Sequence, residues 1–486
     1  MLDRLKTTPV TGRMLIGGQL VESSGGQRMD SINPANEEHV GSVPLGTAED
    51  VERAVTAALA AQRAWAELSP AQRADSLLRL ADALTARADD LLMLEVADTG
   101  NSISGMKGDI AGCIDRLRYF AGLGHELQGH TIPGTSNSLN FTVREPYGVV
   151  GRIVAFNHPL AMSIQGLASP LMAGNAVILK PSEQCPLSAA LLAEIASEAL
   201  PPGVLNIIFG DAAVGNALVR HPRVKRLSFV GSIRTGLAIQ RAAAEVAVKS
   251  ISLELGGKNP FIVFPDVDVE KVATAAVAGM NFIWQGQSCT STSRLFVHDA
   301  IYDQVLRRVV DKVEEIRIGD PFEWTTQMGA INSKAQLERV EDFVRSGEAE
   351  GARLVAGGKR PGGASFAKGF WFQPTVFANV RQEMRIAREE IFGPVLSVIR
   401  WSDVDQVIEM ANSVDYGLTG AVWTHDITTA LRTARRLQSG YIWINGANTQ
   451  ARALPFGGFK NSGVGRERGL EELYSYTEEK SFQISL

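Results

Sequence analysis

Hydrophobic and polar positions along the chain change their period near residue 149. Upstream, residues 51–65 and 70–92 carry apolar side chains at helical spacing, and Thr47 and Ser69 stand where a capping box would open each helix. Downstream, short runs rich in β-formers alternate with helical segments, which favours a parallel sheet with crossover helices. The expected strands of this first series are 149–156, 176–180, 204–209, 226–230 and 251–255, with helices at 187–200 and 232–244.

A second series of the same kind follows Gly256-Gly257. Residues 137–143 alternate polar and apolar side chains outside both series, which predicts a protruding strand. The whole pattern therefore predicts an α/β chain of two units joined near the double glycine. The strands of the second unit are expected at 261–264, 293–297, 396–400, 421–424 and 441–444, and its first helices at 269–282 and 301–316.

The length of 486 residues exceeds what one hydrophobic core supports, so two or more domains are expected. A net charge of -5 provides no basic field to attract nucleic acid. No apolar run approaches the roughly 20 residues needed to cross a bilayer, and residues 1–20 lack the apolar core of a signal peptide. Three cysteines without paired spacing argue against a disulfide framework or a metal site. We therefore expect a cytoplasmic protein with no metal, membrane or nucleic-acid partner.

Two predicted strand ends carry residues that suit a nucleotide, although the Gly-x-Gly-x-x-Gly fingerprint is missing after the first strand. At one of them Ser232 can cap the next helix, with Gly236 in its first turn, and free backbone N–H groups there favour a phosphate. At the other, Lys180 and Glu183 can both reach a ribose at the carboxyl edge of the sheet. Taken alone, the first is better interpreted as an ordinary capped turn and the second as a solvated surface ion pair.

Cys289 and Glu254 are the candidate chemical groups. Cys289 lies in the polar stretch 287–291, whereas a structural cysteine more often lies within an apolar run. Glu254 lies inside an apolar strand, where a buried, unpaired carboxyl has a raised pKa that suits a general base. Each residue alone has an equally good structural interpretation, as a buried thiol or a hydrogen-bonded glutamate. The pattern alone indicates an α/β enzyme with a candidate thiol nucleophile.

Taken together, these segments resemble the aldehyde dehydrogenase superfamily over nearly the whole length. The resemblance implies two doubly wound parallel-sheet domains, a Rossmann-like cofactor domain over 1–126 and 147–254 and a catalytic domain over 255–445. It also implies a β-hairpin oligomerisation arm over 127–146 and 470–486 that builds homodimers or homotetramers. The matching segments, in family order, are IGGQ (16–19), NPA (33–35), FNHPL (156–160), GN (174–175), KPSE (180–183), FVGS (229–232), LELGGKNP (253–260), GQSC (286–289), EEIFGP (389–394) and PFGGFKNSGVG (455–465).

The activity implied by this resemblance is oxidation of an aldehyde to a carboxylic acid with NAD(P)+, through a thioester on Cys289. Asn157 would bind the oxyanion together with the Cys289 N–H. Glu254 would activate the water that hydrolyses the thioester, and its presence argues against the CoA-acylating branch. Glu467 would be the acidic partner of Glu254 in proton exchange.

The resemblance also implies a cofactor site. Lys180 and Glu183 would hold the adenosine ribose, Ser232 the pyrophosphate and Glu390 the nicotinamide ribose. The Glu183 carboxylate would repel a 2′-phosphate, which favours NAD while leaving NADP open. The full set of implied cofactor-binding residues is Lys180, Ser182, Glu183, Phe229, Gly231, Ser232, Gly236, Leu255, Glu390 and Phe392.

Four positions depart from the family's usual residues. Phe156 and His158 flank Asn157 where Trp and Phe are common, and Val230 replaces a common Thr. Gly166 stands at a position that is often Lys in the family. That Lys is thought to help the general base exchange protons. These departures bear on the rate of thioester hydrolysis more than on the type of reaction.

An apolar substrate, either an aromatic or a medium-chain aldehyde, is expected from the implied tunnel lining. Arg452 could instead hold a carboxylate, which would make the chain a semialdehyde dehydrogenase, although a solvent-facing loop residue is the favoured interpretation. Two further alternatives are a catalytically retired binding or structural homologue and a cofactor-free acyl transferase or esterase. The expected tunnel residues are Phe156, Met162, Gln165, Ile283 and Trp284.

Overall fold

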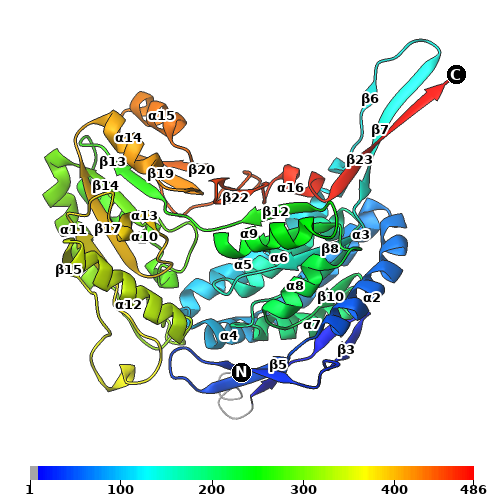
Figure 1. Cartoon of the computed structure of the whole chain (residues 1–486), viewed down its shortest axis with the longest axis horizontal. Helices are drawn as coiled ribbons and strands as arrows, with labels where there is room; N and C mark the ends of the chain where they lie inside the picture. Colours follow the sequence, from blue (N-terminus) through cyan, green and yellow to red (C-terminus); the bar gives the residue numbers. More distant parts are fainter. Residues whose placement is uncertain (1–8) are drawn as a thin grey trace.

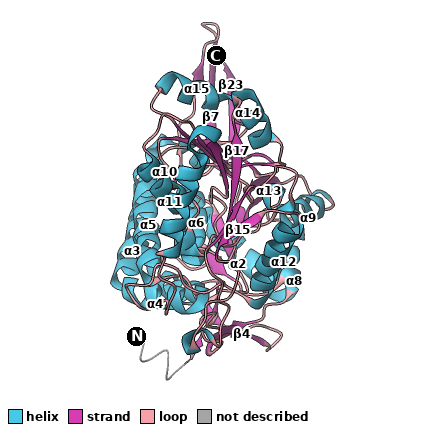
Figure 2. Cartoon of the chain, turned by 90° about the vertical axis from the view of Figure 1, so that its left-hand side faces the viewer, coloured by secondary structure: helices cyan, strands magenta, loops and turns pink. Residues whose placement is uncertain are grey.

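The computed structural model describes residues 9–486. Two lobes, each built on a mostly parallel sheet, lie side by side, and a long hairpin projects from one of them (Figure 1). Figure 2 shows helices on both sides of the strands. The predicted α/β class with parallel sheets is confirmed.

The first lobe contains a sheet of order β22-β12-β11-β8-β9-β10-β2-β3. The strands β12, β11, β8, β9 and β10 run parallel, and β22 and β2 join the two ends of this block antiparallel. All residues of β9 and β11 are buried, as expected where helices cover both faces of a parallel sheet. The strands are β2 (Met14–Ile16), β3 (Gln19–Val21), β8 (Val149–Ile153), β9 (Ala176–Lys180), β10 (Leu205–Ile207), β11 (Arg226–Val230), β12 (Ser250–Glu254) and β22 (Gly463–Val464).

The chain order of this sheet reverses between β8 and β11. From β8 the chain proceeds outward through β9 and β10, then returns to place β11 and β12 on the other side of β8. Open α/β sheets bind ligands at such a switch point, outside the carboxyl ends of the strands. The helices that connect these strands are α6 (Pro159–Met172), α7 (Leu187–Ala199), α8 (Ala212–Arg220) and α9 (Ile233–Ala244).

The second lobe contains a sheet of order β15-β16-β17-β14-β13-β19-β20, in which only β15 runs antiparallel within residues 9–486. Its strands are β13 (Pro260–Val263), β14 (Arg294–His298), β15 (Arg353–Ala356), β16 (Thr375–Ala378), β17 (Val395–Trp401), β19 (Thr419–Trp423) and β20 (Tyr441–Ile444). Its helices are α10 (Val269–Gly279), α11 (Tyr302–Glu314), α12 (Lys334–Ala349), α13 (Arg385–Arg388), α14 (Val404–Asn412) and α15 (Ile427–Arg436).

The N-terminal helices begin at the predicted caps. Thr47 and Ser69 each form a capping box, opening α2 (Ala48–Glu67) and α3 (Pro70–Ala86). The single helix expected over 70–92 is wrong, because the chain turns at Arg87 and continues as α4 (Ala88–Thr99). Leu91, Leu94 and Val96 of α4 are buried, so a straight continuation of α3 would have left these apolar side chains in solvent.

Two further expectations need correction. The helix expected over 269–282 ends at Gly279, and after Asn281 with a φ of 58° a short 3₁₀ turn, η2 (Phe282–Trp284), follows. The strand expected over 149–156 ends at Ile153, which leaves Asn157 in the loop before α6. The short N-terminal strands β1 (Val10–Thr11), β4 (Arg28–Ile32) and β5 (His39–Pro44), which form a small sheet, were not predicted.

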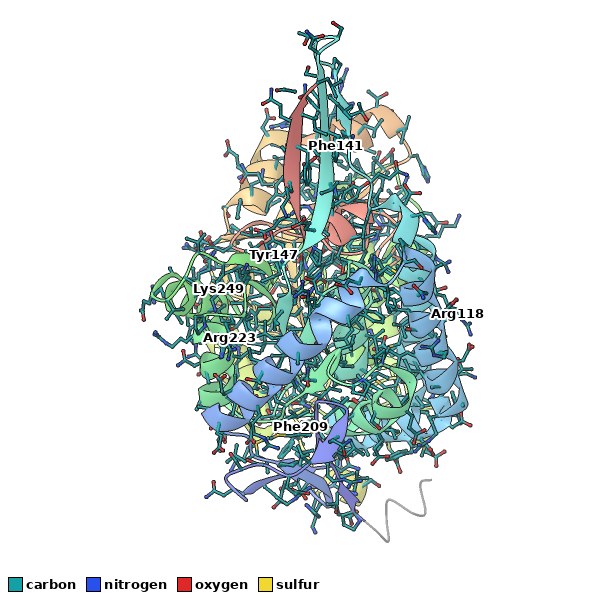
Figure 3. The ribbon with its side chains drawn as sticks, turned by 90° about the vertical axis from the view of Figure 1, so that its right-hand side faces the viewer. Arg118, Phe141, Tyr147, Phe209, Arg223 and Lys249 are labelled. Atoms are coloured by element: carbon teal, nitrogen blue, oxygen red, sulfur yellow. The ribbon has the colours of Figure 1, made fainter. Side chains whose placement is uncertain are left out.

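The projecting hairpin contains β6 (Thr131–Ile132) and β7 (Ser138–Pro146), joined by the C-terminal strand β23 (Thr477–Ser485). The Phe141 ring stacks on that of Phe482 with centroids 4.9 Å apart, and Figure 3 shows Phe141 on the projecting part. Helix α16 (Leu470–Tyr474) leads into β23, and α5 (Ile103–Gly122) precedes the hairpin. Within residues 9–486, no helix is long and apolar enough to cross a membrane.

Candidate active site

The carboxyl edge of the first sheet gathers residues that are far apart in the sequence. Lys180 ends β9, Val230 ends β11 and Glu254 ends β12, while Asn157 follows β8. Because these strands are parallel, all four residues lie at the same edge, at the switch point between β8 and β11.

Glu254 is a buried carboxyl without a partner. It is 6% exposed, and neither carboxyl oxygen has a hydrogen-bond partner within the described chain. Burial first, and then the charge of Glu467, raises the pKa of Glu254 well above its usual value. Burial thus disfavours the ionised form of this carboxyl, which suits a general base that exchanges a proton with water or substrate.

Cys289 lies in the loop between η2 and β14. Asn259 holds this loop, since its Nδ2 donates to the carbonyl of Cys289 at 2.7 Å and to that of Ser291 at 2.9 Å. Cys289 is partly exposed, whereas Cys113 and Cys185 are buried. Burial, with the nearby carboxyls of Glu390 and Glu254, raises the pKa of the Cys289 thiol to about 12. A nucleophilic role therefore requires a base to remove its proton.

The Asn157 amide is fixed beside the same loop. Its Nδ2 donates to the carbonyl of Gln287, two residues before Cys289, at 2.8 Å. An amide nitrogen carries two hydrogens, so one N–H remains available for another acceptor. Asn101 in turn donates to the Asn157 carbonyl at 3.0 Å and holds the backbone at this point.

A cavity of about 380 Å³ contains Cys289 and Glu254 on its wall. Of the predicted tunnel residues, Met162, Gln165 and Trp284 line it. Phe156 instead packs edge-on against Phe392, with ring centroids 5.7 Å apart. The full lining is Gly108, Asp109, Gly112, Cys113, Arg116, His158, Ala161, Met162, Gln165, Val230, Glu254, Trp284, Ser288, Cys289, Thr290, Asn448, Gln450, Phe456, Glu467 and Arg468.

Glu467 lines this cavity and forms a buried ion pair with Arg152. Its carboxylate accepts from Arg152 Nη1 at 2.8 Å and from the Gln165 side chain. Burial acts to raise the pKa of Glu467, but the charge and hydrogen bond of Arg152 outweigh it, so the pKa is lowered. A Cβ at Gly166 would come within 2.1 Å of Arg152 Nε. Arg152 on β8 thus fills the space at Gly166 and pairs with Glu467 from the strand.

The turn after β11 has the form of a phosphate cradle. Ser232 caps the twelve residues of α9, accepting from the backbone N–H of Thr235 at 3.3 Å. A Cβ at Gly231 would lie 2.4 Å from the Phe229 ring, and one at Gly236 would lie 3.0 Å from Leu255. These glycines let the strand end and the helix start pack closely, so the free N–H groups of α9 face the switch point.

The other predicted cofactor residues lie around this edge. Lys180 is buried, and its Nζ donates to the half-exposed Glu183 carboxylate at 3.0 Å. The Ser182 hydroxyl accepts from the Gln184 N–H at 3.2 Å. Glu390 accepts from the Gly257 N–H at 2.8 Å, and burial raises its pKa to about 7. This donor and acceptor set fits a nucleotide.

Several cavity residues were missed by sequence reasoning. Gly108, Asp109, Gly112 and Arg116 lie along one face of α5, and Arg468 follows Glu467. The only signal was the four-residue spacing of Gly108, Gly112 and Arg116, which places them on one helix face. That spacing does not reveal what the face is turned toward.

A model described as the aldehyde dehydrogenase family matches residues 20–482. The chain belongs to the aldehyde dehydrogenase family. The resemblance noted from its motifs is therefore confirmed, and with it the expectation of a dehydrogenase.

The aldehyde dehydrogenase tropH of Talaromyces stipitatus is 44% identical over 466 residues, covering 94% of this chain and 90% of its own length. A Bacillus cereus aldehyde dehydrogenase in complex with NAD+ is 38% identical with a TM-score of 0.96, covering 100% of this chain and 98% of its own. The P. syringae indole-3-acetaldehyde dehydrogenase AldA, in complex with NAD+ and IAA, is 37% identical with a TM-score of 0.97, covering 100% and 99%.

Proposed function

We propose that this aldehyde dehydrogenase oxidises an aldehyde to a carboxylic acid with NAD+, through a thioester on Cys289. One observation carries the proposal: the Cys289 thiol and the unpartnered Glu254 carboxyl share one cavity. A thiol whose pKa is raised to about 12 needs a neighbouring base, and Glu254 is the nearby group that can take up a proton once ionised.

Cys289, Asn157 and Glu254 have separate roles in the reaction. The Cys289 sulfur forms a bond to the aldehyde carbon, and the resulting oxyanion accepts from the free Asn157 N–H and the Cys289 backbone N–H. Loss of the former aldehyde hydrogen together with its bonding electron pair from this adduct leaves a thioester. Glu254 then takes a proton from the water that attacks the thioester carbon, and the acid departs as the C–S bond breaks.

Lys180, Glu183, Ser232 and Glu390 would hold NAD+, which supplies the two-electron acceptor when bound. The support is the capped start of α9, the close packing at Gly231 and the ion pair at the end of β9. The Glu183 carboxylate favours NAD+ over NADP+ because it would repel a 2′-phosphate. Two structural neighbours of the chain are complexes with NAD+.

Glu467 acts on Glu254 through charge. Its pairing with Arg152 keeps Glu467 ionised, and that negative charge contributes to the raised pKa of Glu254. Arg152 takes the space beside Gly166 where many family members are expected to place a Lys. We assign Glu467 a positioning role in which it tunes the base.

The walls provided by Met162 and Trp284 suit an apolar or aromatic body on the aldehyde. Arg452 does not line this cavity; it pairs with Asp115 and its side chain is largely exposed. A semialdehyde held by Arg452 is therefore poorly supported.

We further propose that the projecting hairpin and β23 mediate a homodimer or homotetramer. The arm leaves Ile132, Leu139, Phe482 and Ile484 exposed, and β23 has a free edge within the described chain. The proposed domains are 1–126 and 147–254 for the cofactor, 255–445 for catalysis, and 127–146 with 470–486 for assembly. Ultracentrifugation of Ile484→Lys tests the interface, and an unchanged oligomer would rule out this surface.

The activity is tested by the absorbance of reduced nicotinamide with benzaldehyde and NAD+. We expect Cys289→Ala to abolish turnover while Cys113→Ala, at a second thiol on the same cavity, retains it. We expect Glu254→Gln to lose steady turnover as well, because this variant lacks the base that takes a proton from the Cys289 thiol and from the hydrolytic water. Steady turnover by Cys289→Ala would overturn the mechanism, and equal use of NADP+ would overturn the role of Glu183.

A further inference from the structure

One wall of the Cys289 cavity is formed by a face of α5. Gly108, Asp109, Gly112 and Arg116 all line the cavity, spaced so that they follow one another along the helix. A Cβ built at Gly108 or Gly112 would meet nothing within 4 Å. The two glycines therefore leave open space beside the helix, and the cavity continues along it to Arg116.

Arg116 brings a positive charge to this wall. Its side chain makes no hydrogen bond, salt bridge or ring contact with any residue of 9–486, although Arg118 on the same helix pairs with Asp82. A guanidinium with five donors rarely remains without an acceptor inside a protein cavity. Arg116 is partly exposed, so its acceptors come from solvent or from a ligand in the cavity.

Arg468 presents a second guanidinium to the same cavity. Its backbone has a φ of 75°, and its N–H is held by the Glu472 carboxylate. The side chain lies over the Phe456 ring at 4.4 Å, and its Nε and Nη1 are buried without a partner within the described residues. It forms no ion pair there.

The acidic groups around these arginines are already engaged. Asp109 pairs with His158 at 2.6 Å, and Glu467 pairs with Arg152. Burial raises the pKa of Glu254 well above its usual value and that of Glu472 to about 7, which disfavours the charged form of both carboxyls. Arg116 and Arg468 are the two arginines of the cavity lining, and neither forms an ion pair within residues 9–486.

We propose that Arg116 and Arg468 form a subsite for a carboxylate at the far end of the substrate. This inference rests on the proposed function, and it names the substrate class as an aldehyde that carries a carboxylate on an apolar or aromatic body. Guanidinium groups bind carboxylates with paired, charge-assisted hydrogen bonds. A cavity of about 380 Å³ is of the size that takes a small organic ligand.

The test compares matched aldehydes, 4-carboxybenzaldehyde with benzaldehyde and succinic semialdehyde with butanal. We expect a higher kcat/KM for the carboxylated member of each pair. Arg116→Met and Arg468→Met should each lower that preference about ten- to hundredfold, the value of a lost hydrogen bond to a charged group. Arg118→Met is the matched control, because Arg118 lies on the outer surface (Figure 3) and pairs with Asp82.

A binding measurement separates recognition from catalysis. Calorimetry on Cys289→Ala compares two unreactive analogues, 4-(hydroxymethyl)benzoate and benzyl alcohol. We expect the carboxylated analogue to bind more tightly, and to lose this advantage when Arg116→Met is added. Equal affinities, or equal kcat/KM within each aldehyde pair, would overturn the subsite while leaving the dehydrogenase intact. No turnover of any aldehyde would overturn the proposed function itself.

Discussion

Two walls of the same cavity carry arginines that differ in where their counter-charge lies. On the side of β8, Arg152 is fully buried and its partner Glu467 comes from the chain itself, with further acceptors from Ser228 and Met162. On the side of α5, Arg116 and Arg468 have no acidic partner within residues 9–486. A charge satisfied by the fold holds the fold together, whereas one left unsatisfied is available to a ligand.

Removing the ion pair between Arg152 and Glu467 should have the largest effect on the free energy of unfolding. Arg152→Met removes the cation and leaves the Glu467 carboxylate buried without compensation. Losing one partner of a buried ion pair costs about 3–5 kcal/mol, so we expect a loss of that size in the free energy of unfolding. Denaturant unfolding monitored by fluorescence measures it.

The matched control for this change is the double variant Arg152→Met with Glu467→Gln. It removes both charges, so much of the lost stability should return, and the double-mutant cycle isolates the pair. A loss under about 1 kcal/mol in Arg152→Met alone would show that the two walls do not differ in this way.

The reactivity of Cys289 should rise with pH, and the positive charge of Arg468 should increase it. The thiol pKa is raised to about 12 by burial and by nearby carboxyls, while the charge of Arg468 lowers it. Far below this pKa the thiolate fraction grows about tenfold per pH unit. Alkylation by iodoacetamide should therefore accelerate about tenfold for each pH unit between about pH 7 and pH 9.

Arg468→Met removes the favourable charge and should slow the alkylation of Cys289 at every pH in this range. Mass spectrometry of the Cys289 peptide follows the rate, with Arg118→Met as a control outside the cavity. A plateau below about pH 8 would show that the thiolate is stabilised in the free enzyme, contrary to this picture.

The two walls also differ in how far the sequence could predict them. Strands β9, β11 and β20 match the predicted bounds, because each is a short run in which apolar residues predominate. Cys289 and Glu254 drew attention because each is unusual in its local sequence. Their roles and those of the other site residues stay predictions.

Charge pairing could not be predicted in the same way. Glu467 stands between Arg466 and Arg468 in the sequence, yet its partner is Arg152, 315 residues away. Nothing in the local sequence distinguishes an arginine that forms an ion pair from one that has no acidic partner. The break at Arg87 and the end of α10 at Gly279 likewise depend on what those segments pack against.

The smallest effect is expected from removing the unsatisfied arginine itself. In the free enzyme Arg468 makes no ion pair within the described residues, and two of its nitrogens are buried without acceptors, so its side chain adds little beyond the contact with the Phe456 ring. We expect Arg468→Met to change the free energy of unfolding by less than about 1 kcal/mol, since the lost cation–π contact is offset by the desolvated charge that is removed. The same denaturant titration used for Arg152→Met measures this change. A loss of about 3 kcal/mol or more would mean that Arg468 is satisfied by the fold, and the two walls would then be alike.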